Sequence, residues 1–161
     1  MAINISKPFC QALSLGALSG MRSSAAPAIT SHILSQHHSV NLEHTPLNFM
    51  QSKKVAGALK LLAVAELVGD KIPGIPNRIK ASSLTVRALM GALSGASIYK
   101  ASGSNSFTGA LLGGAAAIAS TFASFYLRKA TVKSTTLIDP IIGGLEDALV
   151  LGAGIGLAET A

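Results

Sequence analysis

The chain has 161 residues, of which 49% are hydrophobic, 12% are charged and 4% are aromatic, and its formal net charge is +6. Its length predicts one domain, and its charged fraction is about half of the roughly 25% that is usual in soluble domains. The basic residues are scattered without an aromatic-interleaved patch, which argues against a nucleic-acid partner. Cys10 is the only cysteine, so an intramolecular disulfide and a cysteine-based zinc site are excluded.

The apolar residues fall into five segments, each of which we expect to be helical. The first runs from Pro8 to about Leu34 and is interrupted at residues 21–24 and again at Pro27, because proline disfavours a continuous helix. The other segments cover residues 55–72, 84–99, 107–127 and 140–158.

The lengths of these segments predict how they sit in a bilayer. Only the fourth and the fifth approach the ~20 residues that an upright span requires. The second and third are short or interrupted by charge, so we expect spans in a thinned region, broken helices or re-entrant segments. Helix starts are expected at Thr45-Pro46, Ser82-Ser83 and Asp139. The prediction is an all-α, polytopic transmembrane bundle packed by Gly and Ala, forming a single domain over residues 1–161.

The second segment ends in two carboxylates and a proline-rich turn. Glu66 and Asp70 are four residues apart and therefore share a helix face, where their like charges oppose each other. In so apolar a segment they are also costly to desolvate, so a cation, a proton or a basic partner should offset them. Pro73 and Pro76 predict a structural turn directly afterwards.

A second acidic pair, Glu146 and Asp147, lies in the middle of the fifth segment. Ionisable groups near a membrane midplane are expensive and face partners or water. Two interpretations stay open: a buried salt-bridge network that includes Arg22 and Arg87, or a site that handles a proton or cation. A carboxylate metal site has little support, because no recognisable ligand loop is present, and no metal or cofactor is expected.

Glycines recur in pairs at four-residue spacing. Each pair makes a flat stripe that lets another helix backbone approach closely, within the bundle or in a homo-oligomer. The pairs are Gly16 with Gly20, Gly91 with Gly95, Gly109 with Gly113, and Gly152 with Gly156.

Residues 35–52 form the polar connecting segment of the predicted domain, and histidines gather in and just before it. Their spacing matches no standard zinc site, so a polar exterior loop is expected. The histidines are His32, His37, His38 and His44. The chain also lacks a nucleophile elbow, a phosphate-binding glycine loop and a metalloprotease motif, so an enzyme is not predicted.

Six short blocks together resemble the bacterial domain-of-unknown-function family 4126 (DUF4126) over about residues 10–158. The most specific block is Glu66-x-x-x-Asp70-Lys71-x-Pro73, and the resemblance is least over residues 35–52. It implies a small integral membrane protein without an assigned activity. The blocks are residues 16–23, 65–73 with 76–78, 87–92, 109–113, 126–128 and 145–147.

Two functions follow as hypotheses for a multi-pass protein of the bacterial inner membrane, with the lipid bilayer as its main partner. In the first, the intramembrane carboxylates serve transport or permeation of a proton, a cation or a small solute. In the alternative, the protein is a noncatalytic structural or assembly protein whose charges are locked into salt bridges.

Overall fold

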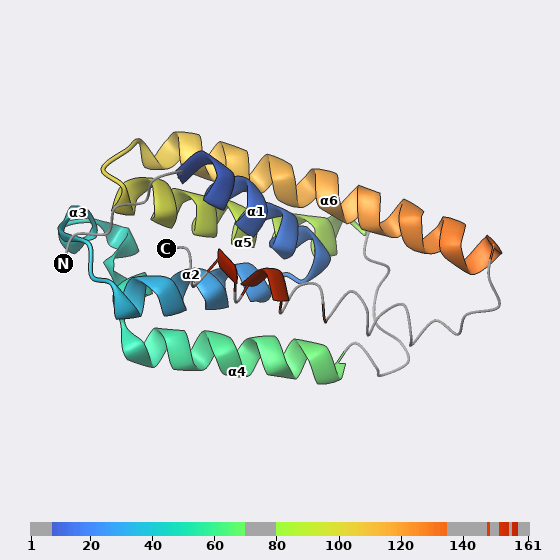
Figure 1. Ribbon diagram of the computed structural model, residues 1–161, viewed down its shortest axis with the longest axis horizontal. Coiled ribbons are helices and arrows are strands. Elements are labelled where there is room, and N and C mark those ends of the chain that lie inside the picture. Colours follow the sequence, from blue (N-terminus) through green and yellow to red (C-terminus); the bar gives the residue numbers. More distant parts are fainter. Residues whose placement is uncertain (1–7, 70–79, 135–147, 149–151, 155, 158–161) are drawn as a thin grey trace.

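The computed structural model describes residues 8–69, 80–134, 148, 152–154 and 156–157. Over these residues the chain is helical and contains no strand (Figure 1). The elements are α1 (Pro8–Met21), α2 (Ala25–Gln36), α3 (Val40–Glu43), the 3-10 helix η1 (Pro46–Gln51), α4 (Lys53–Gly69), α5 (Ala81–Ala101) and α6 (Ser106–Ser134). The all-α prediction is therefore confirmed.

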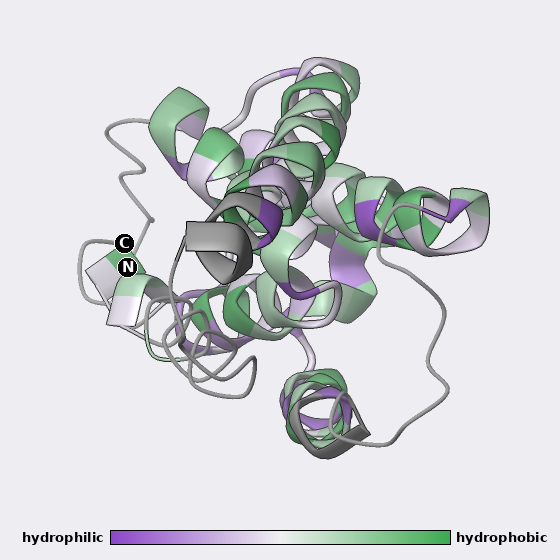
Figure 2. Ribbon diagram, turned by 90° about the vertical axis from the view of Figure 1, so that its right-hand side faces the viewer, coloured by the Kyte–Doolittle hydropathy of each residue, from purple (hydrophilic) through white to green (hydrophobic). Residues whose placement is uncertain are grey.

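Three helices form the centre of the bundle. The helices α5 and α6 make an antiparallel hairpin with the most extensive contact among the described helices, and α1 packs against both of them. The helix α2 packs on α1 and α5, and α4 packs mainly on α2. Figure 2 shows α4 set apart from the other helices, so most of its surface is exposed.

The predicted interruptions of the first apolar segment have different outcomes. The chain does leave the helix between Met21 and Ala25, as the Arg-Ser-Ser sequence indicated. The expected interruption at Pro27 is wrong, because Pro27 is the third residue of α2. The first backbone N–H groups of a helix have no intrahelical partner, so the N–H that proline lacks is not needed there.

Two of the predicted helix starts are corrected by the structure. Thr45-Pro46 begins η1 only, since Ser52 is extended and α4 starts afresh at Lys53. Ser82-Ser83 does not cap α5, which begins at Ala81 with Lys80 at the N-cap position. The third expected start, Asp139, lies outside the described residues.

The turn between α5 and α6 is fixed by backbone hydrogen bonds. Ser104 N–H donates to Tyr99 O at 2.9 Å and Gly103 N–H to Lys100 O at 3.0 Å, which is the Schellman pattern. Gly103 has a φ of 80°, a conformation that glycine adopts without steric cost. Asn105 Oδ1 then accepts from Phe107 N–H at 2.9 Å and caps α6. The chain therefore reverses in a few residues, and α5 and α6 lie side by side.

Glycines allow helices to approach closely in the bundle. On α5, a Cβ added to Gly91 would lie 2.6 Å from the carbonyl oxygen of Gly113 on α6, and one on Gly95 would overlap the backbone of Gly109. On α1, Gly16 and Gly20 likewise face the backbone of α6. Three of the four predicted glycine pairs thus lie at helix contacts. Gly152 and Gly156 have nothing within 4 Å of an added Cβ.

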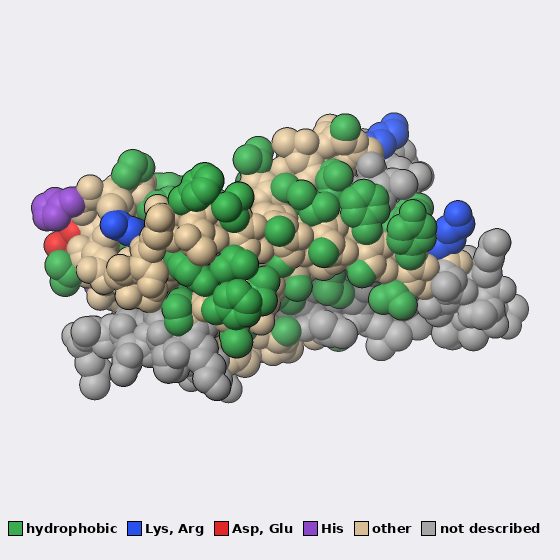
Figure 3. Space-filling model, turned by 90° about the horizontal axis from the view of Figure 1, so that it is seen from above, with side chains coloured by type: hydrophobic (Ala, Val, Ile, Leu, Met, Phe, Trp, Pro, Cys, Tyr) green, Lys and Arg blue, Asp and Glu red, His purple; other side chains and the backbone are tan. Residues whose placement is uncertain are grey.

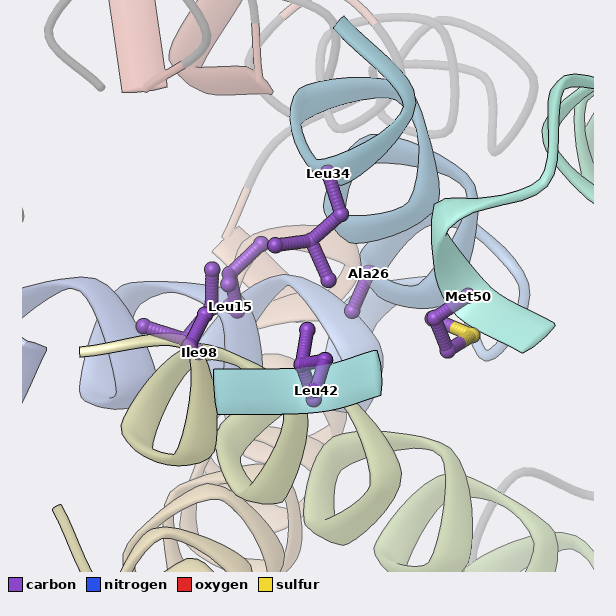
Figure 4. Packing of buried hydrophobic residues seen from close by; sticks show 7 residues of the cluster. Leu15, Ala26, Leu34, Leu42, Met50 and Ile98 are labelled. Carbon is purple, nitrogen blue, oxygen red and sulfur yellow. The ribbon is translucent and has the colours of Figure 1, made fainter. Parts of the chain in front are cut away.

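The hydrophobic core lies where α1, α2 and α5 meet the segment at residues 35–52 (Figure 4). Leu42 and Met50, both completely buried, come from that segment and complete the core. Buried polar side chains hold the segment in place, because Ser31 Oγ donates to Met50 O and Ser39 Oγ to Ala101 O, both at 2.8 Å. The polar connection is therefore a packed end of the bundle.

Among the described residues, one helical stretch, Ser106–Leu127, is long and apolar enough to cross a membrane. Only 22% of its apolar window is buried inside the protein, whereas the core helix of a soluble protein is mostly buried. Figure 3 views the molecule from above. On the surface seen there, hydrophobic side chains lie over the middle and charged side chains lie at the two ends. The five-span arrangement is therefore not confirmed: the other described helices do not meet this criterion, and most of the fifth segment lies outside the described residues.

The α5–α6 contact predicts that replacing glycine by alanine has opposite effects on stability at two positions. Gly95→Ala should destabilise the protein by about 1–3 kcal/mol, because the methyl group forces α5 away from α6. Gly57→Ala on α4, where an added Cβ meets nothing within 4 Å, should stabilise it by up to about 1 kcal/mol. Unfolding of the purified protein followed by circular dichroism measures both effects. Equal stability of the two variants would contradict the close contact.

Candidate functional site

The break between α1 and α2 is a polar place inside the bundle. Three residues, Arg22, Ser23 and Ser24, connect the two helices, and the side chains of Arg22 and Ser24 are buried. A helix end leaves backbone carbonyls without intrahelical partners, and a helix start leaves N–H groups in the same condition. Both kinds of group meet here and need partners from elsewhere in the chain.

Glu66 on α4 supplies the partner for the start of α2. One carboxylate oxygen, Oε1, accepts from Ser23 N at 3.1 Å and from Ser23 Oγ at 2.7 Å. The other, Oε2, accepts from Ser24 N at 2.9 Å and from Ser24 Oγ. All four contacts are donated to the carboxylate, which suits the ionised form, and a negative charge at a helix N-terminus is favourable.

Arg87 on α5 supplies the partner for the end of α1. Its Nη1 donates to the carbonyl oxygens of Gly20 at 2.7 Å and Met21 at 2.8 Å, and its Nε donates to Ser83 Oγ at 3.3 Å. In return, Ser19 Oγ donates to Arg87 O at 2.8 Å. A cation at a helix C-terminus is the favourable complement to the carboxylate at the neighbouring N-terminus.

The long helix α6 and the break itself add further bonds. Thr121 Oγ1 donates to Gly20 O at 3.1 Å, and Ser120 Oγ donates to Ala17 O at 2.8 Å. Arg22 Nη1 donates to the backbone carbonyl of Glu66 at 3.4 Å. Side chains from α4, α5 and α6 therefore meet at one break, which we call the capped break and define as residues 20–24 with Glu66, Arg87 and Thr121.

The capped break brings together three of the predicted site residues, Glu66, Arg22 and Arg87. The others, Asp70, Glu146, Asp147, Pro73 and Pro76, lie outside the described residues. Sequence reasoning did not assign a role to Ser23 and Ser24 or to Thr121. A signal for the serines was present, because serine before an apolar run is a preferred N-cap.

The four histidines take two different places. His32 lies on α2, with its Nδ1 3.1 Å from Lys60 Nζ on α4. An ammonium group can only donate, so this ring nitrogen acts as the acceptor. His37, His38 and His44 are exposed at the packed end of the bundle. In the described part of the chain, no group of three or more His, Cys, Asp or Glu side chains is arranged to hold a metal ion.

Thr121 marks the position of the capped break along α6. Thr121 precedes Leu127, the last residue of the apolar stretch, by six positions, which is about 9 Å along a helix. The break thus lies beside the apolar stretch and toward one of its ends. Chemically, the site is a set of helix ends whose polar groups are bonded to side chains of the same chain.

Comparison with known proteins agrees with the resemblance of the sequence blocks. The family described as "Domain of unknown function (DUF4126)" has a model that matches residues 9–158. The chain belongs to DUF4126. The match includes every residue of the capped break. Searches of curated proteins and of solved structures find no match.

The capped break predicts that this DUF4126 protein depends on the carboxylate of Glu66 for stability. Glu66→Ala should lower the free energy of unfolding by about 1–3 kcal/mol, because Ser23 and Ser24 would lose their acceptor. Glu43→Ala is the matched control, since Glu43 is exposed on α3. Denaturant unfolding of the two variants measures the difference.

A double-substitution cycle separates the cap from other effects of Glu66. Adding Ser24→Ala to Glu66→Ala should cost less than Ser24→Ala costs alone, because the bond between the two side chains is already lost. Strictly additive costs would show that the two residues do not act together.

Proposed function

We propose that this DUF4126 protein is a multi-pass protein of the bacterial inner membrane with a noncatalytic structural or assembly role. The observation that carries the proposal is the use of the charges at the capped break. Glu66 accepts four hydrogen bonds from Ser23 and Ser24, directly before α2, and Arg87 donates two to the end of α1. These contacts serve to hold a broken helix inside an apolar bundle.

Residence in the membrane is supported by the outer surface of the helices. Large apolar side chains are exposed along α4, α5 and α6, including Leu61 at 73%, Leu89 at 63% and Leu111 at 58%. Several contiguous apolar surfaces of this kind are unusual on a soluble monomer. Inside the bundle, small hydroxyl side chains bond to carbonyls of neighbouring helices, which is how membrane helices are often joined.

The second candidate function is permeation of a proton, a cation or a small solute. It is favoured by the position of the capped break, where the ends of two half-helices meet charged side chains beside an apolar stretch. Substrate sites of many transporters are built from such discontinuous helices. Glu66 is partly exposed, and its carboxylate faces the break.

Membrane residence predicts the behaviour of the protein in alkaline carbonate extraction. Because several apolar surfaces would contact acyl chains, the protein should stay in the membrane pellet and be released only by detergent. A peripheral membrane protein of the same cells serves as the control and should be released. Release of this protein by carbonate would contradict the embedded bundle and leave a peripheral or soluble assembly protein.

The two candidate functions predict different ion fluxes across a membrane that contains the protein. Under the structural role, vesicles that contain the purified protein should take up protons, K⁺ or Na⁺ no faster than empty vesicles, as measured with entrapped fluorescent indicators. Flux that appears with the protein and disappears in a folded Glu66→Gln variant would replace the structural role by the second candidate. Glu43→Gln again provides the charge-matched control.

A further inference from the structure

One end of the molecule is assembled from two stretches of the chain, residues 36–54 and 99–107. Ser39 Oγ and Asn41 Nδ2, on either side of the α3 start, donate to Ala101 O at 2.8 and 3.1 Å. Gln51 Oε1, the last residue of η1, accepts from Ser39 N at 2.7 Å. The first turn of α4 follows η1 directly, so it lies at the same end as the turn between α5 and α6.

This end is rich in basic side chains, and we call it the lysine end. It carries Lys53 and Lys54, which are exposed, and Lys100, which is partly exposed. In the described residues 36–54 and 99–107, the acidic side chain is that of Glu43. Three lysines and one glutamate give this end a formal charge of +2 when the histidines are neutral. His37, His38 and His44 are exposed beside them and add positive charge when protonated.

Large apolar side chains are exposed at the same end. Val40 on α3 is 74% exposed, Phe49 on η1 is 46% exposed and Phe107 on the first turn of α6 is 67% exposed. Aromatic and basic side chains together are typical of the boundary between acyl chains and headgroups, where apolar groups insert and cations face the phosphates. The first turn of α6 is also where its apolar stretch begins.

We propose that the lysine end binds the headgroups of anionic phospholipids, with Phe49 and Phe107 inserted between the acyl chains. The proposal rests on the membrane residence proposed above and adds the class of lipid. Clustered lysines next to an apolar surface attract anionic headgroups, and each contributes roughly a fivefold preference near the membrane surface. Zwitterionic headgroups give no comparable gain, because their net charge is zero.

Native mass spectrometry of the detergent-purified protein tests this inference. The protein is mixed with equal amounts of phosphatidylglycerol and phosphatidylcholine, and the ratio of the two retained lipids is measured. The unsubstituted chain should retain phosphatidylglycerol in at least about tenfold excess. The combined variant Lys53→Gln, Lys54→Gln and Lys100→Gln should bring the ratio near one, and so should 0.5 M salt, which screens the attraction.

The control for charge is Lys80→Gln with Lys129→Gln, which removes two exposed lysines at the other end of α5 and α6; it should keep the excess, whereas the equally charged pair Lys53→Gln with Lys54→Gln should lower it. Inorganic phosphate should not compete, since the site takes a headgroup with its acyl chains. An unchanged ratio in the triple variant, or an equal loss in the control, would overturn the lysine end as the site. Retention of neither lipid, or of both without preference, would overturn this inference, whereas membrane residence itself is overturned only by release of the protein in carbonate extraction.

Discussion

The structure depends on one point inside the bundle where two helices end and side chains from other helices bond to their unpaired backbone groups. The helix α1 stops and α2 starts inside the bundle, so carbonyls and N–H groups that are satisfied in a continuous helix need other partners. Arg87 takes the carbonyls and Glu66 takes the N–H groups, each with the charge that the helix dipole favours. These contacts tie α4 and α5 to the break, and α6 joins through Thr121. One local polar requirement therefore connects five helices, α1, α2, α4, α5 and α6.

A second constraint is the close approach of α1, α5 and α6. Backbone groups at Gly91, Gly95, Gly109 and Gly113 are too near the opposite helix to leave room for a Cβ. At this distance short hydroxyl side chains reach the neighbouring carbonyls, as Ser19 and Ser120 do. Dispersion contacts and short hydrogen bonds thus replace the large aromatic core of a soluble domain.

The helix α4 has a different relation to the bundle. It packs mainly on α2, and its contacts include two polar ones, Glu66 with the serines and Lys60 with His32. Its outward side chains, among them Leu61 and Val64, are exposed. Polar contacts on one side and apolar side chains on the other suit a helix that lies between the bundle and the acyl chains of the proposed membrane.

The sequence by itself determined the all-helical class, the family, the interruption at residues 21–24 and the pairing of glycines, because composition, the polar Arg-Ser-Ser run and four-residue spacing are local properties. It also singled out Glu66, Arg22 and Arg87 as charges that need compensation. Only the tertiary structure decided the partners described at the capped break, because these backbone and hydroxyl groups lie more than 40 positions away in the chain, apart from Ser83, which is four positions from Arg87. It likewise decided that residues 35–52 pack as an end of the bundle, since Leu42 and Met50 are buried by contacts with distant helices.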